Sequence, residues 1–360
     1  MKRIALILSM LTICICMSAQ SKKLYFTEGH ELNLVGKLMT DTPNPYHRVD
    51  TVKYKGFTAG ENKQVRSAAG LAIAFNTNSS TITVKGEFGY INRNNNTMGV
   101  ALRGYDLYIK KDGQWRYAAS KANADGKEGE NLTLISNMDN SMKECLLYLP
   151  MYSELRSLQI GVEEGSKIEA GKDPFRHRVG IFGSSYTQGI SISRSGMSYP
   201  MQFTRHTGIQ LLSLGCSGNC KMQPYFADVL CDAKVDALIF DAFSNPDAKM
   251  IEERLFPFIE KIQSAHPDIP LIFQQTIYRE SRNFDQKNEE KERAKQEMAE
   301  KLMKEAVKKY KNVYFVQTNA TDALHETSVD GIHPDNYGYT LWARSIEKQV
   351  LKILKKYGIK

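Results

Sequence analysis

The pattern of hydrophobic and polar positions divides the chain into two parts, and the pattern changes near residue 170. In the first part, short runs alternate between polar and apolar residues. Residues 81–88, which read TITVKGEF, alternate with a period of two and predict a strand with one buried face. Further strands are predicted at residues 100–110, 115–118, 145–149 and 155–162. Several short strands separated by turn-rich polar clusters are typical of a β-sandwich or jelly roll.

In the second part, short continuous apolar runs alternate with longer segments whose apolar residues recur at helical spacing. Residues 247–264 illustrate such a segment, because apolar side chains recur there every three or four positions. Strands are predicted at residues 179–182, 210–214, 235–240, 269–273 and 313–316, and helices at residues 198–207, 224–231, 247–264, 286–310 and 337–357. This alternation indicates βαβ units and therefore a parallel sheet flanked by helices.

A polar segment with glycine and proline, residues 165–174, lies between the two parts and is predicted to be a linker. A chain of 360 residues is long for one domain, so two domains are expected. The prediction is an N-terminal β-sandwich domain over residues 21–168 and an α/β domain over residues 175–360.

The first twenty residues are typical of a signal peptide. Lys2 and Arg3 precede an apolar run over residues 4–17, and small residues follow at Ser18 and Ala19. The apolar run is short for a membrane span. We therefore expect cleavage after Ala19 or Gln20, removal of residues 1–20, and a periplasmic or secreted protein without a stable membrane span.

The composition is that of an ordinary globular protein, with 42% hydrophobic and 24% charged residues and a formal net charge of +8. Much of the excess of lysine and arginine falls in predicted helices at residues 287–311 and 344–360, which is typical of solvated helix faces. No basic patch with an aromatic platform and no nucleic-acid-binding motif accompanies it, so nucleic acid is not an expected partner.

Four cysteines remain after the signal peptide: Cys145, Cys216, Cys220 and Cys231. In an oxidising compartment a pair of them could form a disulfide, and Cys216 and Cys220 are candidates because they are close in sequence. Zinc ligands at paired CxxC or His-rich spacing are missing from the sequence, so no metal site is predicted. A cysteine nucleophile is not favoured, because no histidine lies near in sequence.

Candidate chemistry centres on residues 178–189, which read RVGIFGSSYTQG. An apolar run ends at Gly183, two serines follow, and a helix N-terminus is expected next. Parallel α/β sheets bind their ligands at this carboxyl end of the strands. A serine there becomes a nucleophile when a histidine, oriented by a carboxylate, takes its proton.

The segment Asp330-Gly331-Ile332-His333-Pro334 supplies both groups just before the last helix. A tight turn can set the carboxylate of Asp330 against one ring nitrogen of His333, and the other nitrogen can face the serine. Three other histidines, His177, His206 and His266, lack a carboxylate in this register. His325 follows Asp322 at the same spacing but does not lie directly before the last predicted helix. We predict Ser185 as the nucleophile and Ser184 as a residue that caps the helix.

Acyl transfer also needs donors for the negative oxygen of the intermediate. The backbone N–H groups of Ser185 and Gly218 and the side-chain amide of Asn245 are the predicted donors, because all three follow predicted strands. The alternatives are that Asn245 caps the helix beginning near residue 247 and that Gly218 is an ordinary turn glycine.

These residues resemble the SGNH (GDSL-type) hydrolases, which are named for Ser, Gly, Asn and His in four sequence blocks. Residues 183–187, Gly218, Asn245 and the segment 330–333 match the blocks in order. The resemblance implies a flavodoxin-like sheet from about residue 176 onward. Two positions differ: Ser184 replaces the usual Asp before the nucleophile, and Pro246 follows Asn245 where Asp is common. Both departures suggest a sub-branch rather than a simple lipase.

Residues 104–108, which read GYDLY, resemble the GxDLY motif of β-rich domains that precede SGNH hydrolase domains in secreted bacterial proteins. The resemblance implies an exported serine esterase without metal or organic cofactor. The expected substrates are O-acetyl or other short acyl esters of carbohydrates, either small molecules or polysaccharides. The alternatives are a lipid or thioester acylhydrolase, or a carbohydrate-binding protein with a vestigial hydrolase domain.

Overall fold

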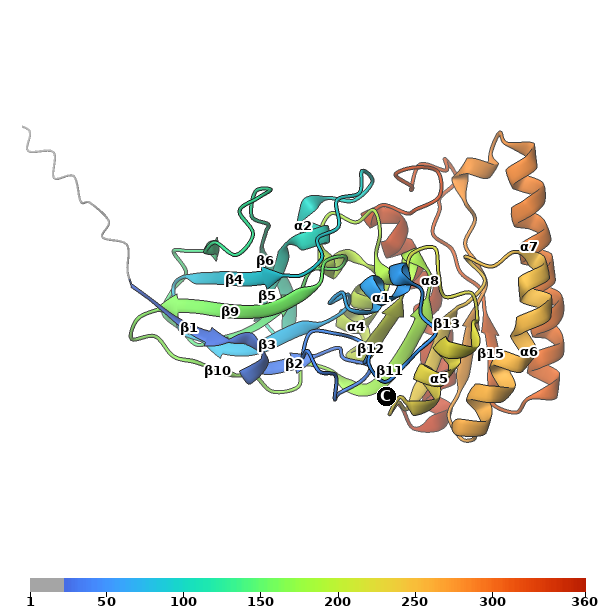
Figure 1. Cartoon of the computed structure of the whole chain (residues 1–360), viewed down its shortest axis with the longest axis horizontal. Coiled ribbons are helices and arrows are strands. Elements are labelled where there is room, and N and C mark those ends of the chain that lie inside the picture. The colour runs from blue at the N-terminus through green and yellow to red at the C-terminus, as the bar shows by residue number, and fades with distance from the viewer. Residues whose placement is uncertain (1–22) are drawn as a thin grey trace, which may run out of the picture.

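The structure is a computed structural model that describes residues 23–360, so the predicted signal peptide at residues 1–20 lies outside the described residues. A β-rich part lies at one end of the molecule and a layered α/β part at the other (Figure 1). Among the described helices, none combines the length and the apolar character needed to cross a membrane.

The β-rich part contains two sheets in which every pair of neighbouring strands is antiparallel. The first has the order β1-β9-β4-β7, from β1 (Leu24–Glu28), β4 (Ile82–Phe88), β7 (Leu132–Ile135) and β9 (Leu155–Glu163). The second has the order β10-β3-β8-β5-β6 with β2 beside β3, from β2 (Asn33–Val35), β3 (Ala72–Thr77), β5 (Tyr105–Lys111), β6 (Gln114–Lys121), β8 (Lys143–Tyr148) and β10 (Ile168–Ala170). A shared core, with Val84 from the first sheet and Phe75 from the second, joins them.

Three local features of this part differ from the sequence prediction. Residues 100–103 were expected in a strand, but Gly99–Arg103 form the short helix α2. Successive side chains of a strand point to opposite faces, so a strand with one buried face would expose either Ala101 or Leu102. Both residues are buried, which the helix allows. A second short helix, α1 (Ala59–Val65), begins at a capping box between Thr58 and Glu61. Strand β10 lies in the predicted linker and pairs with β3.

The α/β part confirms the predicted parallel sheet. Its strands are β11 (Arg176–Gly183), β12 (Ile209–Gly215), β13 (Ala237–Asp241), β14 (Leu271–Gln274) and β15 (Val313–Val316), in the order β12-β11-β13-β14-β15. This is the flavodoxin-like order, in which the chain reverses direction across the sheet beside β11. The crevice at the carboxyl end of β11 is therefore the expected ligand site.

Helices cover both faces of this sheet. They are α3 (Ser185–Gln188), α4 (Tyr199–Thr207), α5 (Pro224–Asp232), α6 (Ala248–Ala265), α7 (Gln286–Lys309) and α8 (Asn336–Leu354). Phe182 of β11 packs in one core with α5, α6 and α7, whereas its neighbour Ile181 packs in the other with α4 and α8. Alternate residues of each buried strand thus serve opposite cores, which explains the continuous apolar runs in the sequence.

The edge of the parallel sheet at β12 is covered by the β-rich part. Arg48 is fully buried, and its guanidinium donates hydrogen bonds to the carbonyls of Ser213 (3.1 Å) and Gly215 (3.0 Å) on β12. The same guanidinium donates to the carbonyls of Ser67 and Gln64. Carbonyl groups that would pair with a further strand are therefore satisfied by one side chain.

Candidate active site

The turn after β11 presents Ser185 at the start of α3. Gly183 is required at the end of the strand, because a Cβ there would lie 2.1 Å from Thr187 Oγ1. Ser184 is the N-cap: its Oγ accepts from the Tyr186 N–H (3.2 Å) and donates to Asp241 Oδ2 (2.6 Å). The Ser185 side chain is left for other contacts. Its N–H stands in the first turn of α3, where amides lack an intrahelical acceptor.

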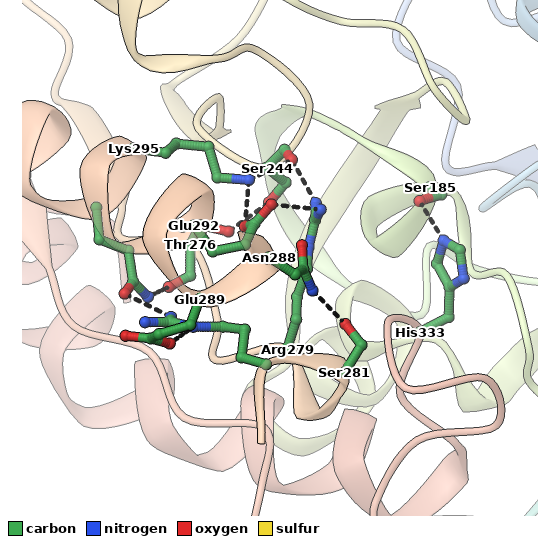
Figure 2. A network of polar contacts seen from close by, with 12 residues as sticks. Ser185, Ser244, Thr276, Arg279, Ser281, Asn288, Glu289, Glu292, Lys295 and His333 are labelled. Carbon is green, nitrogen blue, oxygen red and sulfur yellow. Dashed lines mark hydrogen bonds and ion pairs between the residues drawn. The ribbon is translucent and has the colours of Figure 1, made fainter. Parts of the chain in front are cut away.

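Ser185, His333 and Asp330 form a continuous chain of polar contacts. His333 Nε2 lies 3.1 Å from Ser185 Oγ, a contact that Figure 2 shows, and His333 Nδ1 lies 2.8 Å from Asp330 Oδ2. Asp330 Oδ1 accepts the backbone N–H groups of Ile332 (3.0 Å) and His333 (2.8 Å). The turn passes through Gly331 at φ +78°, where a side chain would be strained.

Asp330 keeps its charge in this setting. Burial alone would raise its pKa, but hydrogen bonds from His333 and Asn96 outweigh burial and lower the pKa from 3.8 to about 2. The Asn96 amide comes from the β-rich part and donates to Asp330 Oδ2 at 2.8 Å. An ionised carboxylate therefore faces the imidazole over the whole neutral range.

The loops with Gly218 and Asn245 contact each other, and Tyr152 links the Gly218 loop to Ser185. The hydroxyl of Tyr152 lies 2.7 Å from Ser217 Oγ and 3.5 Å from the Ser185 carbonyl. Asn245 Nδ2 donates to the Asn219 carbonyl at 2.5 Å. Gly218 lies between these anchors and is exposed, at φ +70°. Asp247 rather than Asn245 is the N-cap of α6, which excludes the helix-capping alternative for Asn245.

Glu280 holds the loop that leads to Asp330. One carboxylate oxygen accepts from Thr321 Oγ1 (2.6 Å), Thr327 N (2.9 Å) and Thr327 Oγ1 (2.8 Å), and the other accepts from Ser328 Oγ (2.5 Å). Burial raises the pKa of Glu280, but these hydrogen bonds outweigh it and lower the pKa to about 2. No motif marks Glu280 in the sequence, because its partners lie more than forty residues away.

A buried network of charged side chains is connected to His333 through Tyr186, and Figure 2 shows Arg279, Glu292 and Lys295 of this network. The Tyr186 ring packs edge-on against His333 at 5.5 Å, and Arg279 Nε donates to Tyr186 OH at 2.8 Å. Arg279 also pairs with Glu292 at 2.9 Å, while Lys295 donates to the Ser244 carbonyl at 3.2 Å. Burial lowers the pKa of Lys295 to about 8.

The charged residues of α7 are predicted from the sequence to lie on a solvated face. For Glu292 and Lys295 this was wrong: they are 1% and 3% exposed. The sequence pattern did not reveal these two residues because α7 packs there against other polar groups. The Arg279 guanidinium and the Ser244 carbonyl take the place of water around Glu292 and Lys295.

The remaining candidates lie in other contacts. His325 Nδ1 lies 2.6 Å from Asn283 Oδ1, and His266 Nε2 lies 2.8 Å from the Leu230 carbonyl. The four cysteines are free, so the candidate pair Cys216 and Cys220 is not disulfide-bonded. The Cys220 thiol instead contacts the Leu214 carbonyl at 3.5 Å. Within residues 23–360, no cluster of three or more His, Cys, Asp or Glu side chains is placed to hold a metal ion.

Two family models match the chain. The N-terminus of SGNH-hydrolase-type esterases, named for its GxDLY motif, matches residues 24–168, and the GDSL-like lipase/acylhydrolase family matches residues 176–352. None of the curated proteins compared with the chain matches it.

Solved structures are similar over nearly the whole chain. A protein from Bacteroides ovatus ATCC 8483, described as a GDSL-like lipase, is 39% identical, with a TM-score of 0.88 over 92% of this chain and 98% of its own. A family two carbohydrate esterase from Cellvibrio japonicus has 11% identity and a TM-score of 0.61, over 93% of this chain and 99% of its own. An acetyl xylan esterase from Butyrivibrio proteoclasticus has 12% identity and a TM-score of 0.56 over the same shares. The last two show likeness of fold alone.

Proposed function

The chain belongs to the GDSL-like lipase/acylhydrolase family and is a hydrolase of ester bonds, and from this premise we propose that it removes O-acetyl or other short acyl groups from carbohydrates. We propose that Ser185, His333 and Asp330 carry the reaction as a triad. The observation that supports this most directly is the 3.1 Å contact between His333 Nε2 and Ser185 Oγ.

In the proposed reaction, Ser185 Oγ attacks the ester carbonyl while His333 Nε2 takes its proton. The tetrahedral intermediate collapses, the carbon–oxygen bond to the alcohol breaks, and His333 returns the proton to the leaving alkoxide. Water then attacks the acyl-enzyme with His333 again as base, the bond from the acyl carbon to Ser185 Oγ breaks, His333 returns the proton to Ser185 Oγ, and the carboxylic acid leaves. Asp330 holds the imidazole in the tautomer that leaves Nε2 free to accept, and its charge stabilises the imidazolium.

The proposed oxyanion donors are the N–H groups of Ser185 and Gly218 and the Asn245 amide. An amide NH₂ has two donor hydrogens. One of those of Asn245 is used by the Asn219 carbonyl, which fixes the group and leaves the other for substrate.

The carbohydrate assignment has two supports. Carbohydrate esterases share the fold over nearly the whole chain. Amide side chains also lie near the proposed site: Asn96 contacts Asp330, and Asn219, which follows Gly218, contacts Gln64. Such polar surroundings suit an alcohol that bears further hydroxyl groups.

Hydrolysis of p-nitrophenyl acetate by the wild type and by Ser185→Ala tests the proposed triad. We expect loss of at least about a thousandfold in kcat. Equal rates would remove Ser185 as the nucleophile. Esters of graded acyl length separate a short-chain esterase from a lipid acylhydrolase, and acetate released from acetylated polysaccharides identifies the acceptor. Glycan binding without any ester turnover would favour a vestigial hydrolase instead.

We also propose export to the periplasm or beyond, on the pattern of residues 1–20. Mass spectrometry of the mature protein should place its N-terminus at Gln20 or Ser21. A retained Met1 would contradict export by cleavage.

A further inference from the structure

One loop of the β-rich part, residues 89–98 between β4 and α2, reaches the proposed triad. Its Asn96 Nδ2 donates to Asp330 Oδ2 at 2.8 Å. The same oxygen faces His333 Nδ1 at 2.8 Å. Asn96 and Asp330, which are 234 positions apart in the sequence, are therefore joined by a hydrogen bond. The bond ends on Oδ2 of Asp330, the oxygen that orients His333.

The orientation of the Asn96 amide is fixed by its neighbour. Thr97 Oγ1 donates to Asn96 Oδ1 at 3.2 Å, so the donor side of the amide is turned toward Asp330. Thr97 Oγ1 also accepts the backbone N–H of Ser191 at 2.9 Å, just beyond the helix that begins with Ser185. The loop thus contacts both segments that carry the proposed triad.

The GxDLY motif anchors this loop to the α/β part. The loop runs through α2 directly into β5, where Asp106 is fully buried. Both carboxylate oxygens of Asp106 accept from Arg194 Nη1 (3.0 and 2.9 Å), and one also accepts the Gly196 N–H (2.8 Å). The Arg194 guanidinium lies 4.4 Å from the centre of the Tyr117 ring. A buried ion pair of this kind holds the two parts in one register.

We propose that Asn96 is a positioning residue for catalysis: its amide holds Asp330 Oδ2 in line with His333 Nδ1, so that the β-rich part completes the active site. This rests on the proposed triad. A carboxylate oxygen accepts two hydrogen bonds comfortably, and a second donor fixes its rotamer. The donor also makes the oxygen less basic, so that the proton stays on the imidazole when His333 is charged.

The test compares Asn96→Ala and Asn96→Asp with the wild type, by kcat and KM for p-nitrophenyl acetate across pH. Asp330 and Tyr186 face His333, and Arg279 lies behind Tyr186. Both variants keep these three residues, and both remove one of the hydrogen bonds that lower the pKa of Asp330. Asn96→Ala should lower kcat about tenfold and change KM less than about twofold, because one hydrogen bond to a charged group is lost. In Asn96→Asp the donor is replaced by a second carboxylate, which repels the Asp330 carboxylate and adds negative charge that stabilises the protonated imidazole. The acid limb of kcat/KM should then move up by about one pH unit.

The matched control is Asn95→Ala, one position earlier on an exposed side chain, which should behave as wild type. Thermal melting shows that each variant is folded. If Ser185→Ala is inactive but both Asn96 variants match the wild type in kcat and in the acid limb, the positioning role is overturned. It is also overturned if Asn96→Asp lowers kcat without moving the limb. If Ser185→Ala is as active as wild type, the triad itself fails, which is a separate result.

Discussion

Replacing Glu280 by Gln should loosen the loop that carries Asp330 and His333. Glu280 is 8% exposed and accepts hydrogen bonds from Thr321, Thr327 and Ser328. Its pKa falls from 4.5 to about 2. A lowering of this size corresponds to about 3 kcal/mol of folding free energy at neutral pH. Glutamine keeps the shape and one good acceptor oxygen, so we expect the variant to lose about 1–3 kcal/mol.

The sign of the pH dependence follows from the direction of this shift. Because the folded pKa of Glu280 is depressed, its contribution is fully present above the unfolded value of 4.5 and is lost as the pH falls toward about 2. The difference in unfolding free energy between wild type and variant should therefore be full at neutral pH and shrink as the pH falls below about 4.5.

Urea unfolding at neutral pH and at about pH 3 measures this difference, and ester hydrolysis reports on the loop. Glu326→Gln is the matched control, because Glu326 lies in the same loop with an exposed side chain. It should leave stability unchanged at both pH values. A Glu280→Gln difference that is the same at both pH values would refute the assignment of stability to the charge of this carboxylate.

Three further predictions concern Asp330 and the ion pair between Asp106 and Arg194. Asp330→Asn should lower kcat by about 10³–10⁴-fold without loss of fold, because the amide favours the wrong imidazole tautomer; equal kcat values would contradict the role of Asp330. Since the pKa of Asp330 is about 2, protonation of this carboxylate should not steepen the fall of log kcat/KM between about pH 5 and 3, and a slope of two in that range would show that Asp330 titrates there. Asp106→Ala should cost about 3 kcal/mol in urea unfolding, because it leaves Arg194 without its buried partner. Glu144→Ala breaks an exposed ion pair with Lys110 and should cost less than about 0.5 kcal/mol; similar losses in the two variants would contradict the importance of burial.

The order of elements was predictable because each strand of the parallel sheet is buried on both faces. Strand β15 was predicted with its observed bounds, Val313–Val316. The errors fall where local pattern and tertiary contacts disagree. Helix α2 follows from burying Ala101 and Leu102 together, and β10 forms because β3 offers unpaired backbone groups to a polar segment.

The proposed site likewise contains some residues that could be predicted from the sequence and others that could not. Asp330 and His333 could be paired from the sequence because a turn of three residues brings them together. Asn96 and Glu280 could not, because their contacts exist only after distant segments pack. Asparagine and glutamate are also common on surfaces, so their residue types carried no signal.

Arg48 affects whether the α/β part can be produced without the β-rich part. Strand β12 is an outer strand of the parallel sheet, and an outer strand with open carbonyls can recruit a strand from another molecule. The guanidinium occupies this position at Ser213 and Gly215. A fragment that begins at β11 would lack Arg48, so the outer carbonyl groups of β12 would have no hydrogen-bond partner. Such a fragment should self-associate when expressed alone. In the intact chain Arg48 is synthesised well before β12, so the cover for this edge is already present when the strand emerges.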